Sequence, residues 1–156
     1  MNNALKLILS VGIPVAGGLA AGLLSGSGDG SWYKTINKPT WNPPSWVFGP
    51  VWTTLYILMG IALYLVWRKE DNSKMKGWAI GLFFFQLALN FAWSFIFFSL
   101  HEIGWSLVEM LLMWICILIT IFMFARYSKL SAWLLVPYIS WVSFATVLTW
   151  TIWLLN

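Results

Sequence analysis

Charged side chains are scarce in this 156-residue chain, in which only 9% of the residues are Asp, Glu, Lys or Arg. A soluble domain carries about 25%. A fold of this size cannot cover a water-exposed surface with so few charges, so the composition excludes an ordinary soluble protein. The net charge of +4 does not indicate nucleic-acid binding, because the basic residues lie in short loops between apolar runs.

Side chains for metal binding and acid–base chemistry are equally scarce. His101 is the only histidine and is expected to be a solvated loop residue, and Cys116, the only cysteine, lies inside an apolar run. One cysteine cannot form an intrachain disulfide. With no ligand cluster and no nucleophile–base pair, the sequence predicts no metal site, no bound cofactor and no conventional catalytic dyad.

Long apolar runs dominate the chain, which is 60% hydrophobic. Five runs are each near the roughly 20 residues that a helix needs to cross a bilayer. They cover about residues 5–24, 46–67, 77–99, 104–125 and 132–155. Continuous apolarity, rather than alternation, excludes a β-barrel. The sequence predicts an all-α integral membrane protein, a single domain over residues 1–156 built as a bundle of five transmembrane helices.

The first run also resembles a signal peptide, since Lys6 precedes it and small residues follow. Its length and Pro14 favour an uncleaved helix. Small residues at Gly18, Gly22 and Gly26, and again at Gly77 and Gly81, have the spacing of close helix contacts. Packing within the chain and a homodimer face both explain them.

Basic residues predict the orientation of the bundle. Seven of the nine fall on the side that holds the N-terminus and the second and fourth loops, and two fall in the first loop. Basic loops stay in the cytoplasm. We therefore expect a cytoplasmic N-terminus, with the first loop and the C-terminus outside.

Tryptophan is abundant, at 13 residues. Most fall near the ends of the runs, where amphipathic rings form interfacial belts. Others share helix faces with polar residues that are costly to expose to lipid. There are four such sets, and the members of each set share one face of a helix: Gln86, Asn90 and Trp93; Tyr138, Trp141 and Ala145; Phe48, Trp52 and Tyr56; and Trp105 and Glu109.

These faces predict an internal aromatic pocket with a few hydrogen-bonding groups, suited to a flat and largely apolar ligand. Hydrogen bonds between helices alone would also explain Asn90 and Gln86. Glu109 would either point into the bundle or lie shallow and reach the lipid headgroups.

A proline-rich stretch, KPTWNPPSWVFGPVWTTLY, joins the first loop to the second run at residues 38–56. Its four prolines fix φ and push the preceding residues out of the α conformation, so the loop is expected to be stiff and extended until a helix begins near Trp46 or Pro50. A stiff segment bearing Trp32, Trp41 and Trp46 is either a lid over the bundle or an interfacial anchor.

This stretch resembles the signature of the translocator protein family (TspO/MBR, tryptophan-rich sensory proteins, peripheral-type benzodiazepine receptors). Further matching stretches are WY at 32–33, QLALNFAWSFIFF at 86–98, GW at 104–105 and PYISWVSFATVL at 137–148. The resemblance covers nearly the whole chain and implies a five-helix bundle whose cavity opens towards the first loop, often in a homodimer.

The resemblance implies a receptor or sensor that binds protoporphyrin IX and similar flat hydrophobic ligands. The implied ligand-binding residues are Trp41, Trp46, Phe48, Trp52, Asn90, Trp93, Trp105, Tyr138, Trp141 and Ala145. Light- and oxygen-dependent porphyrin degradation is an alternative, in which Trp52 and Trp141 match the tryptophans implicated in the family. Transport across the membrane is another, although five helices do not divide into equal inverted repeats.

The resemblance is incomplete at the end of the fifth run. Animal members carry a sterol motif there, L/V-x-Y-x-K/R, whereas Trp150 stands at the tyrosine position here and no Lys or Arg follows. The Gly77–Gly81 pair also begins about a turn from its place in some relatives. With short loops and no presequence, a bacterial cell membrane is the expected location.

Overall fold

The computed structural model describes residues 1–27 and 31–156, and within these ranges the regular structure is helical. The elements in chain order are α1 (Asn3–Ser25), α2 (Ser31–Thr35), α3 (Ser45–Trp67), α4 (Lys74–Ser94), η1 (Phe95–Ser99), α5 (Ile103–Ala125), α6 (Lys129–Leu134) and α7 (Val136–Leu155). Five helical stretches in the described part of the chain are long and apolar enough to cross a membrane. The predicted all-α membrane fold is confirmed.

Two spans differ from the continuous helices that the apolar runs suggest. The third span continues from α4 into η1, a π-helical turn, and the fifth is divided at Leu135 into α6 and α7. Pro137 explains the second break, because a proline has no N–H to donate to the carbonyl four residues earlier and its ring crowds that turn. Proline is accepted at the start of α7, where donors lack partners in any case.

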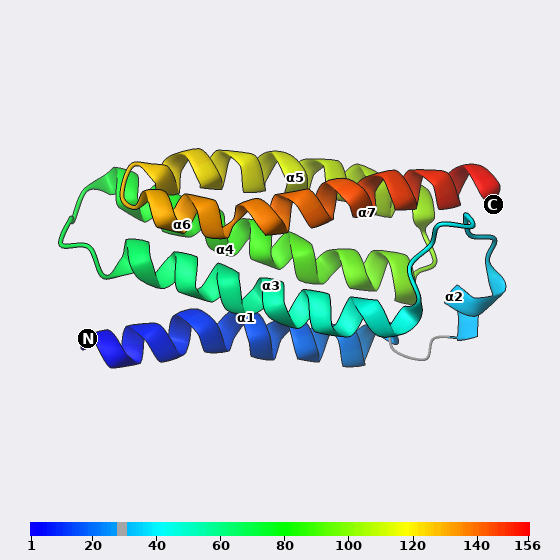
Figure 1. Ribbon diagram of the computed structural model, residues 1–156, viewed down its shortest axis with the longest axis horizontal. Helices are drawn as coiled ribbons and strands as arrows, with labels where there is room; N and C mark the ends of the chain where they lie inside the picture. Colours follow the sequence, from blue (N-terminus) through cyan, green and yellow to red (C-terminus); the bar gives the residue numbers. More distant parts are fainter. Residues whose placement is uncertain (28–30) are drawn as a thin grey trace.

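The helices run roughly along one axis, with α1 beside α3 and with α5 packed on both α4 and α7. The N-terminus, the α3–α4 turn and the α5–α6 turn gather at one end of the bundle (Figure 1). The C-terminus, α2 and the η1–α5 turn gather at the other. The N-terminus and the two loops whose basic residues predicted the orientation therefore lie at the same end of the bundle. Which end faces the cytoplasm stays a prediction.

The tightly packed core fills the end of the bundle that holds the N-terminus. Met59, Leu63 and Val66 of α3 have no exposed surface there, nor do Phe83 of α4 and Phe124 of α5. The rings of Phe83 and Phe124 stack with centroids 5.8 Å apart. Such dense packing leaves no room for a ligand at this end.

Glycines let α1 approach α3 closely. A Cβ at Gly60 would lie 2.5 Å from Val11 Cα, and a Cβ at Gly18 would overlap the Tyr56 ring. Gly18 therefore serves packing within the chain, one of its two predicted roles. Gly77 and Gly81 differ, since a Cβ at either would meet nothing within 4 Å, and their role in a homodimer stays a prediction.

Replacing Gly60 by alanine is expected to destabilise the bundle. The added Cβ would meet backbone atoms, Val11 Cα at 2.5 Å and the Ser10 carbonyl oxygen at 2.6 Å, which cannot move without shifting a helix. Overpacking of this kind costs about 1–3 kcal/mol. Thermal unfolding of the purified protein in detergent measures the loss.

Gly81→Ala is the matched control, because its Cβ enters open space on α4. It should hold or raise the unfolding temperature, since alanine favours a helix over glycine by about 1 kcal/mol. Equal losses in both variants would contradict the close α1–α3 contact.

Candidate ligand-binding site

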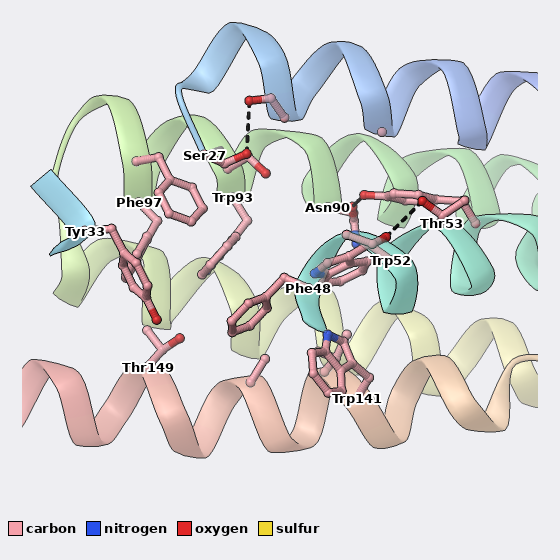
Figure 2. A pocket seen from close by; sticks show the side chains of 18 of the residues that line it. Ser27, Tyr33, Phe48, Trp52, Thr53, Asn90, Trp93, Phe97, Trp141 and Thr149 are labelled. Atoms are coloured by element: carbon pink, nitrogen blue, oxygen red, sulfur yellow. Dashed lines mark hydrogen bonds between the residues drawn. The ribbon is translucent and has the colours of Figure 1, made fainter. Parts of the chain in front are cut away.

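A cavity of about 780 Å³ occupies the end of the bundle opposite the packed core. Side chains from α1, α3, α4, η1, α5 and α7 line it, so every span contributes to its wall. Figure 2 shows rings from several helices converging on this space. The volume falls within the range of about 300–1,000 Å³ that is usual for small-molecule sites.

Seven of the ten predicted ligand-binding residues line the cavity. They are Trp46, Phe48, Trp52, Asn90, Trp93, Trp141 and Ala145. Helical spacing placed six of them on shared faces, because residues three, four or seven apart present one face to the same neighbour. Trp46 was named by the family resemblance alone.

Three predicted residues do not line the cavity. Tyr138 is completely buried beneath it. Trp41 is 46% exposed and packs edge-on against Phe144, with ring centroids 5.9 Å apart. Trp105 is 68% exposed on the outside of the bundle.

The inward orientation expected for Trp105 is wrong, whereas both carboxylate oxygens of Glu109 are buried and find no hydrogen-bond partner among the described residues. The two residues share a face of α5 as predicted, but that face borders a separate hollow beside Ile96 and Leu100. Met110 and Met113 line the main cavity instead. Spacing shows which residues share a face, and it cannot show which of two apolar faces of α5 turns inward.

Aromatic pairs form the walls of the cavity. Trp52 stacks on Tyr56 with centroids 5.6 Å apart, and Trp93 stacks on Phe97 at 4.9 Å. Phe48 meets Trp141 edge-on at 6.0 Å (Figure 2). Rings held against one another in these geometries present flat, fixed faces to whatever enters.

A chain of hydrogen bonds forms the floor of the cavity. Tyr56 Oη donates to Asn90 Oδ1 at 2.6 Å, and Asn90 Nδ2 donates to Tyr138 Oη at 3.1 Å. Tyr138 Oη then donates to Gln86 Oε1 at 2.7 Å. Hydrogen bonding between helices is thus confirmed for Asn90 and Gln86, and Asn90 also lines the cavity.

Two indole N–H groups in the cavity wall lack a partner. The Nε1 atoms of Trp93 and Trp141 are buried, and neither finds a hydrogen-bond acceptor among the described residues. Trp114 provides the contrast, since its Nε1 donates to Ser143 Oγ at 2.8 Å. A buried donor without an acceptor costs about 1–3 kcal/mol, and both side chains line the cavity, so a ligand acceptor that reached these atoms would remove that cost.

The lid, residues 31–44, lies at the end of the bundle opposite the N-terminus (Figure 1), and its Tyr33 lines the cavity. It is not extended throughout, because it begins with α2, which the sequence did not predict. Trp32 of α2 stacks on His101 at 4.3 Å and meets Phe97 edge-on at 5.4 Å. His101 is exposed as expected, yet it also supports the lid. Interactions distant in sequence, which no local pattern reports, stabilise this short helix.

Tyr33 of the lid lines the cavity and was not among the predicted site residues. Its only signal in the sequence was its place in the WY pair. Burial raises the pKa of its phenol, although the hydrogen bond that it donates to Asn42 Oδ1 at 2.9 Å opposes this shift. Lys38 Nζ donates to the Tyr33 carbonyl at 2.6 Å, which fixes α2 against the rest of the lid.

The C-terminus holds the lid from the other side. The Asn37 backbone N–H donates to Asn156 Oδ1 at 3.0 Å, and Asn156 Nδ2 donates to the Asn37 carbonyl at 2.8 Å. The lid is therefore attached both to the η1–α5 turn and to the end of α7.

Comparison with known proteins places this architecture in a family. Residues 10–154 match the TspO/MBR family. The chain is 43% identical over 156 residues to the tryptophan-rich protein TspO of Chlorobaculum tepidum, covering 97% of this chain and 96% of that protein. It is 44% identical over 123 residues to the human translocator protein, covering 78% of this chain and 73% of that protein. It is 36% identical to the tryptophan-rich sensory protein of Cereibacter sphaeroides, covering 80% and 77%. The chain belongs to the TspO/MBR family.

Proposed function

We propose that this membrane protein is a receptor that captures tetrapyrroles such as protoporphyrin IX, and similar flat hydrophobic ligands, in the cavity between its helices. The observation that carries the proposal is the pair of unpartnered indole donors, on Trp93 and Trp141, in an otherwise aromatic wall. Relatives with the printed names translocator protein and tryptophan-rich sensory protein support a sensing or transporting role in the membrane.

The walls suit a large flat ring system. Trp52, Phe48 and Trp141 come from two helices and border one space, so a planar ligand gains contact on both faces (Figure 2). Aromatic pairs contribute about 0.5–1.5 kcal/mol each beyond the area that they bury. The hydrogen-bonded floor fixes Tyr56 and Asn90, so little ordering remains when a ligand arrives.

Acceptor groups complete the ligand chemistry. The propionate carboxylates of protoporphyrin IX are strong acceptors, and indole N–H groups can only donate. Binding would satisfy donors that are otherwise buried without partners. The ligand preferred by this reasoning has an apolar planar body and at least one carboxylate or carbonyl at its edge.

Light-driven porphyrin degradation is a second candidate, favoured by the position of Trp52 and Trp141 in the cavity wall. Dioxygen is the oxidant: it adds across one methine C=C bond of the excited porphyrin, and that bond breaks into two carbonyls that retain both oxygen atoms. The reaction needs no acid–base dyad, and the two indoles would exchange electrons with the excited ring along the way.

A bacterial cell membrane, a cytoplasmic N-terminus and a homodimer remain part of the proposal. Charge bias supports the orientation, and the open face around Gly77 and Gly81 leaves room for a second helix. Trp150, at the place of the sterol-motif tyrosine, does not favour specific sterol binding.

Trp93→Phe is expected to weaken protoporphyrin IX binding about three- to tenfold. The substitution keeps an aromatic ring and removes one donor, and a hydrogen bond contributes about 0.5–1.5 kcal/mol. Titration in the dark, followed by porphyrin absorbance, measures the affinity. Trp150→Phe, on an exposed side chain outside the cavity, should leave it unchanged. No saturable binding to the wild type would refute the proposed function.

Ala145→Phe is expected to weaken binding more strongly, by tenfold or more, because the new ring occupies the cavity. Val147→Phe, two residues away on the exposed face of α7, is the matched control. If both variants bind porphyrin like the wild type, the ligand lies away from α7.

Trp52→Phe with Trp141→Phe is expected to abolish light-dependent loss of porphyrin absorbance. Affinity should fall less than about tenfold, because both rings are kept and one unpartnered donor is lost. Trp150→Phe with Trp153→Phe removes two exposed indoles and serves as the control. Undiminished bleaching in the cavity variant would remove the electron-transfer role from Trp52 and Trp141.

A further inference from the structure

The cavity has an opening on the side of the bundle. Leu19 and Leu23 of α1 line the cavity, and they are 59% and 83% exposed. Trp46 of α3 also lines it and is 75% exposed. A residue that borders the cavity and the outside together marks a gap in the wall, and these residues place the gap between α1 and α3.

The gap begins where the close contact of the two helices ends. Gly60 meets Val11, and Gly18 meets Tyr56, towards the packed end of the bundle. Beyond Gly18, a Cβ at Gly49 of α3 would meet nothing within 4 Å. The seam is therefore closed beside the core and open beside the cavity.

The gap lies at membrane depth and is apolar. Leu19 is six residues from the end of α1 at Ser25, which places it roughly 9 Å inside the helix end at 1.5 Å per residue. Thr53 borders the cavity here, but its hydroxyl donates to the Gly49 carbonyl at 2.9 Å. An apolar molecule passing through the gap meets leucines, a glycine and a satisfied hydroxyl.

The end of the cavity that faces water is covered instead. The lid is held to the η1–α5 turn by Trp32 on His101, and to the end of α7 by Asn37 and Asn156. Entry from water requires these contacts to break, whereas entry from the bilayer requires none of them to change.

We infer that the ligand enters and leaves sideways, from the hydrocarbon of the bilayer, through a portal formed by Leu19, Leu23, Trp46, Gly49 and Thr53. The inference rests on the proposed function and adds the route and the source of the ligand. The portal suits a flat apolar molecule that has already dissolved in the membrane, where such molecules concentrate.

Gly49→Phe tests the portal by placing a ring in the gap. Protoporphyrin IX is delivered from liposomes to the protein in nanodiscs, and stopped-flow quenching of tryptophan fluorescence gives the association and dissociation rates. Both rates are expected to fall about tenfold, because a barrier at the portal slows entry and exit alike. Gly49 also borders the cavity, and a ring that only crowded the ligand would instead raise the dissociation rate. Gly12→Phe, on an open and exposed face of α1 that does not line the cavity, should leave both rates unchanged.

Leu23→Trp is a second portal variant that enlarges an exposed side chain without touching the core. It should slow both rates in the same way if Gly49→Phe fails to fold. A separate experiment tests entry through the lid by cross-linking it in place. Cysteines are introduced by Asn37→Cys and Asn156→Cys in a Cys116→Ser background, and a short bis-maleimide joins them. Cross-linking should leave the association and dissociation rates unchanged.

The outcomes separate the two claims. Rates that are slowed by the cross-link and unaffected by Gly49→Phe and Leu23→Trp, with affinity intact, overturn the portal and leave the proposed function standing. Absence of saturable binding to the wild type overturns the proposed function, and the portal with it. Slowed exchange in the portal variants alone supports both.

Discussion

A buried chain of four side chains, Tyr56–Asn90–Tyr138–Gln86, is the constraint on which the rest of the structure depends. Within a bilayer no water is available to satisfy a polar group, so each of these side chains must find a partner on another helix. The chain connects α3, α4 and α7 at one level of the bundle. Any movement of one helix along another would leave buried oxygen or nitrogen atoms without partners, at about 1–3 kcal/mol each.

This level divides the bundle into two halves with different physical roles. On one side, Met59, Phe83 and Phe124 pack without exposed surface and set the spacing of the helices. On the other side the same spacing is not filled by side chains, and the cavity remains. The packed half keeps the open half in shape, and the unsatisfied indoles of Trp93 and Trp141 border the open half. A preformed site whose two indole donors have no acceptor is suited to capture a ligand that supplies one.

The sequence predicted most of the architecture because the bilayer leaves few alternatives. Continuous apolar runs of about 20 residues are confirmed as five spans, and helical periodicity placed Asn90, Trp93 and Trp141 on faces that meet at the cavity. It failed on α5, where almost every residue is apolar and composition does not distinguish an inward face from a lipid face. Trp105 was misplaced for that reason.

The lid shows a different limit of sequence reasoning. Its prolines do mark the approach to α3, which begins at Ser45, close to the predicted Trp46. The helix α2 and the contacts of Asn37 with Asn156 depend on residues more than 60 positions away, so no local signal reports them. The same holds for the gap between α1 and α3, which depends on how the two helices pack rather than on the sequence of either.

The central claim is that Trp93 and Trp141 donate to a ligand within the cavity. Indole ¹⁵N–H nuclear magnetic resonance spectra of the protein in nanodiscs test it most directly, with the resonances assigned by single Trp→Phe substitutions. On addition of protoporphyrin IX, the account predicts that the Trp93 and Trp141 indole proton resonances move downfield as these buried donors gain an acceptor, while those of the exposed Trp150 and Trp153 do not change. Shifts at Trp150 and Trp153 alone, or at none of the four, would contradict it.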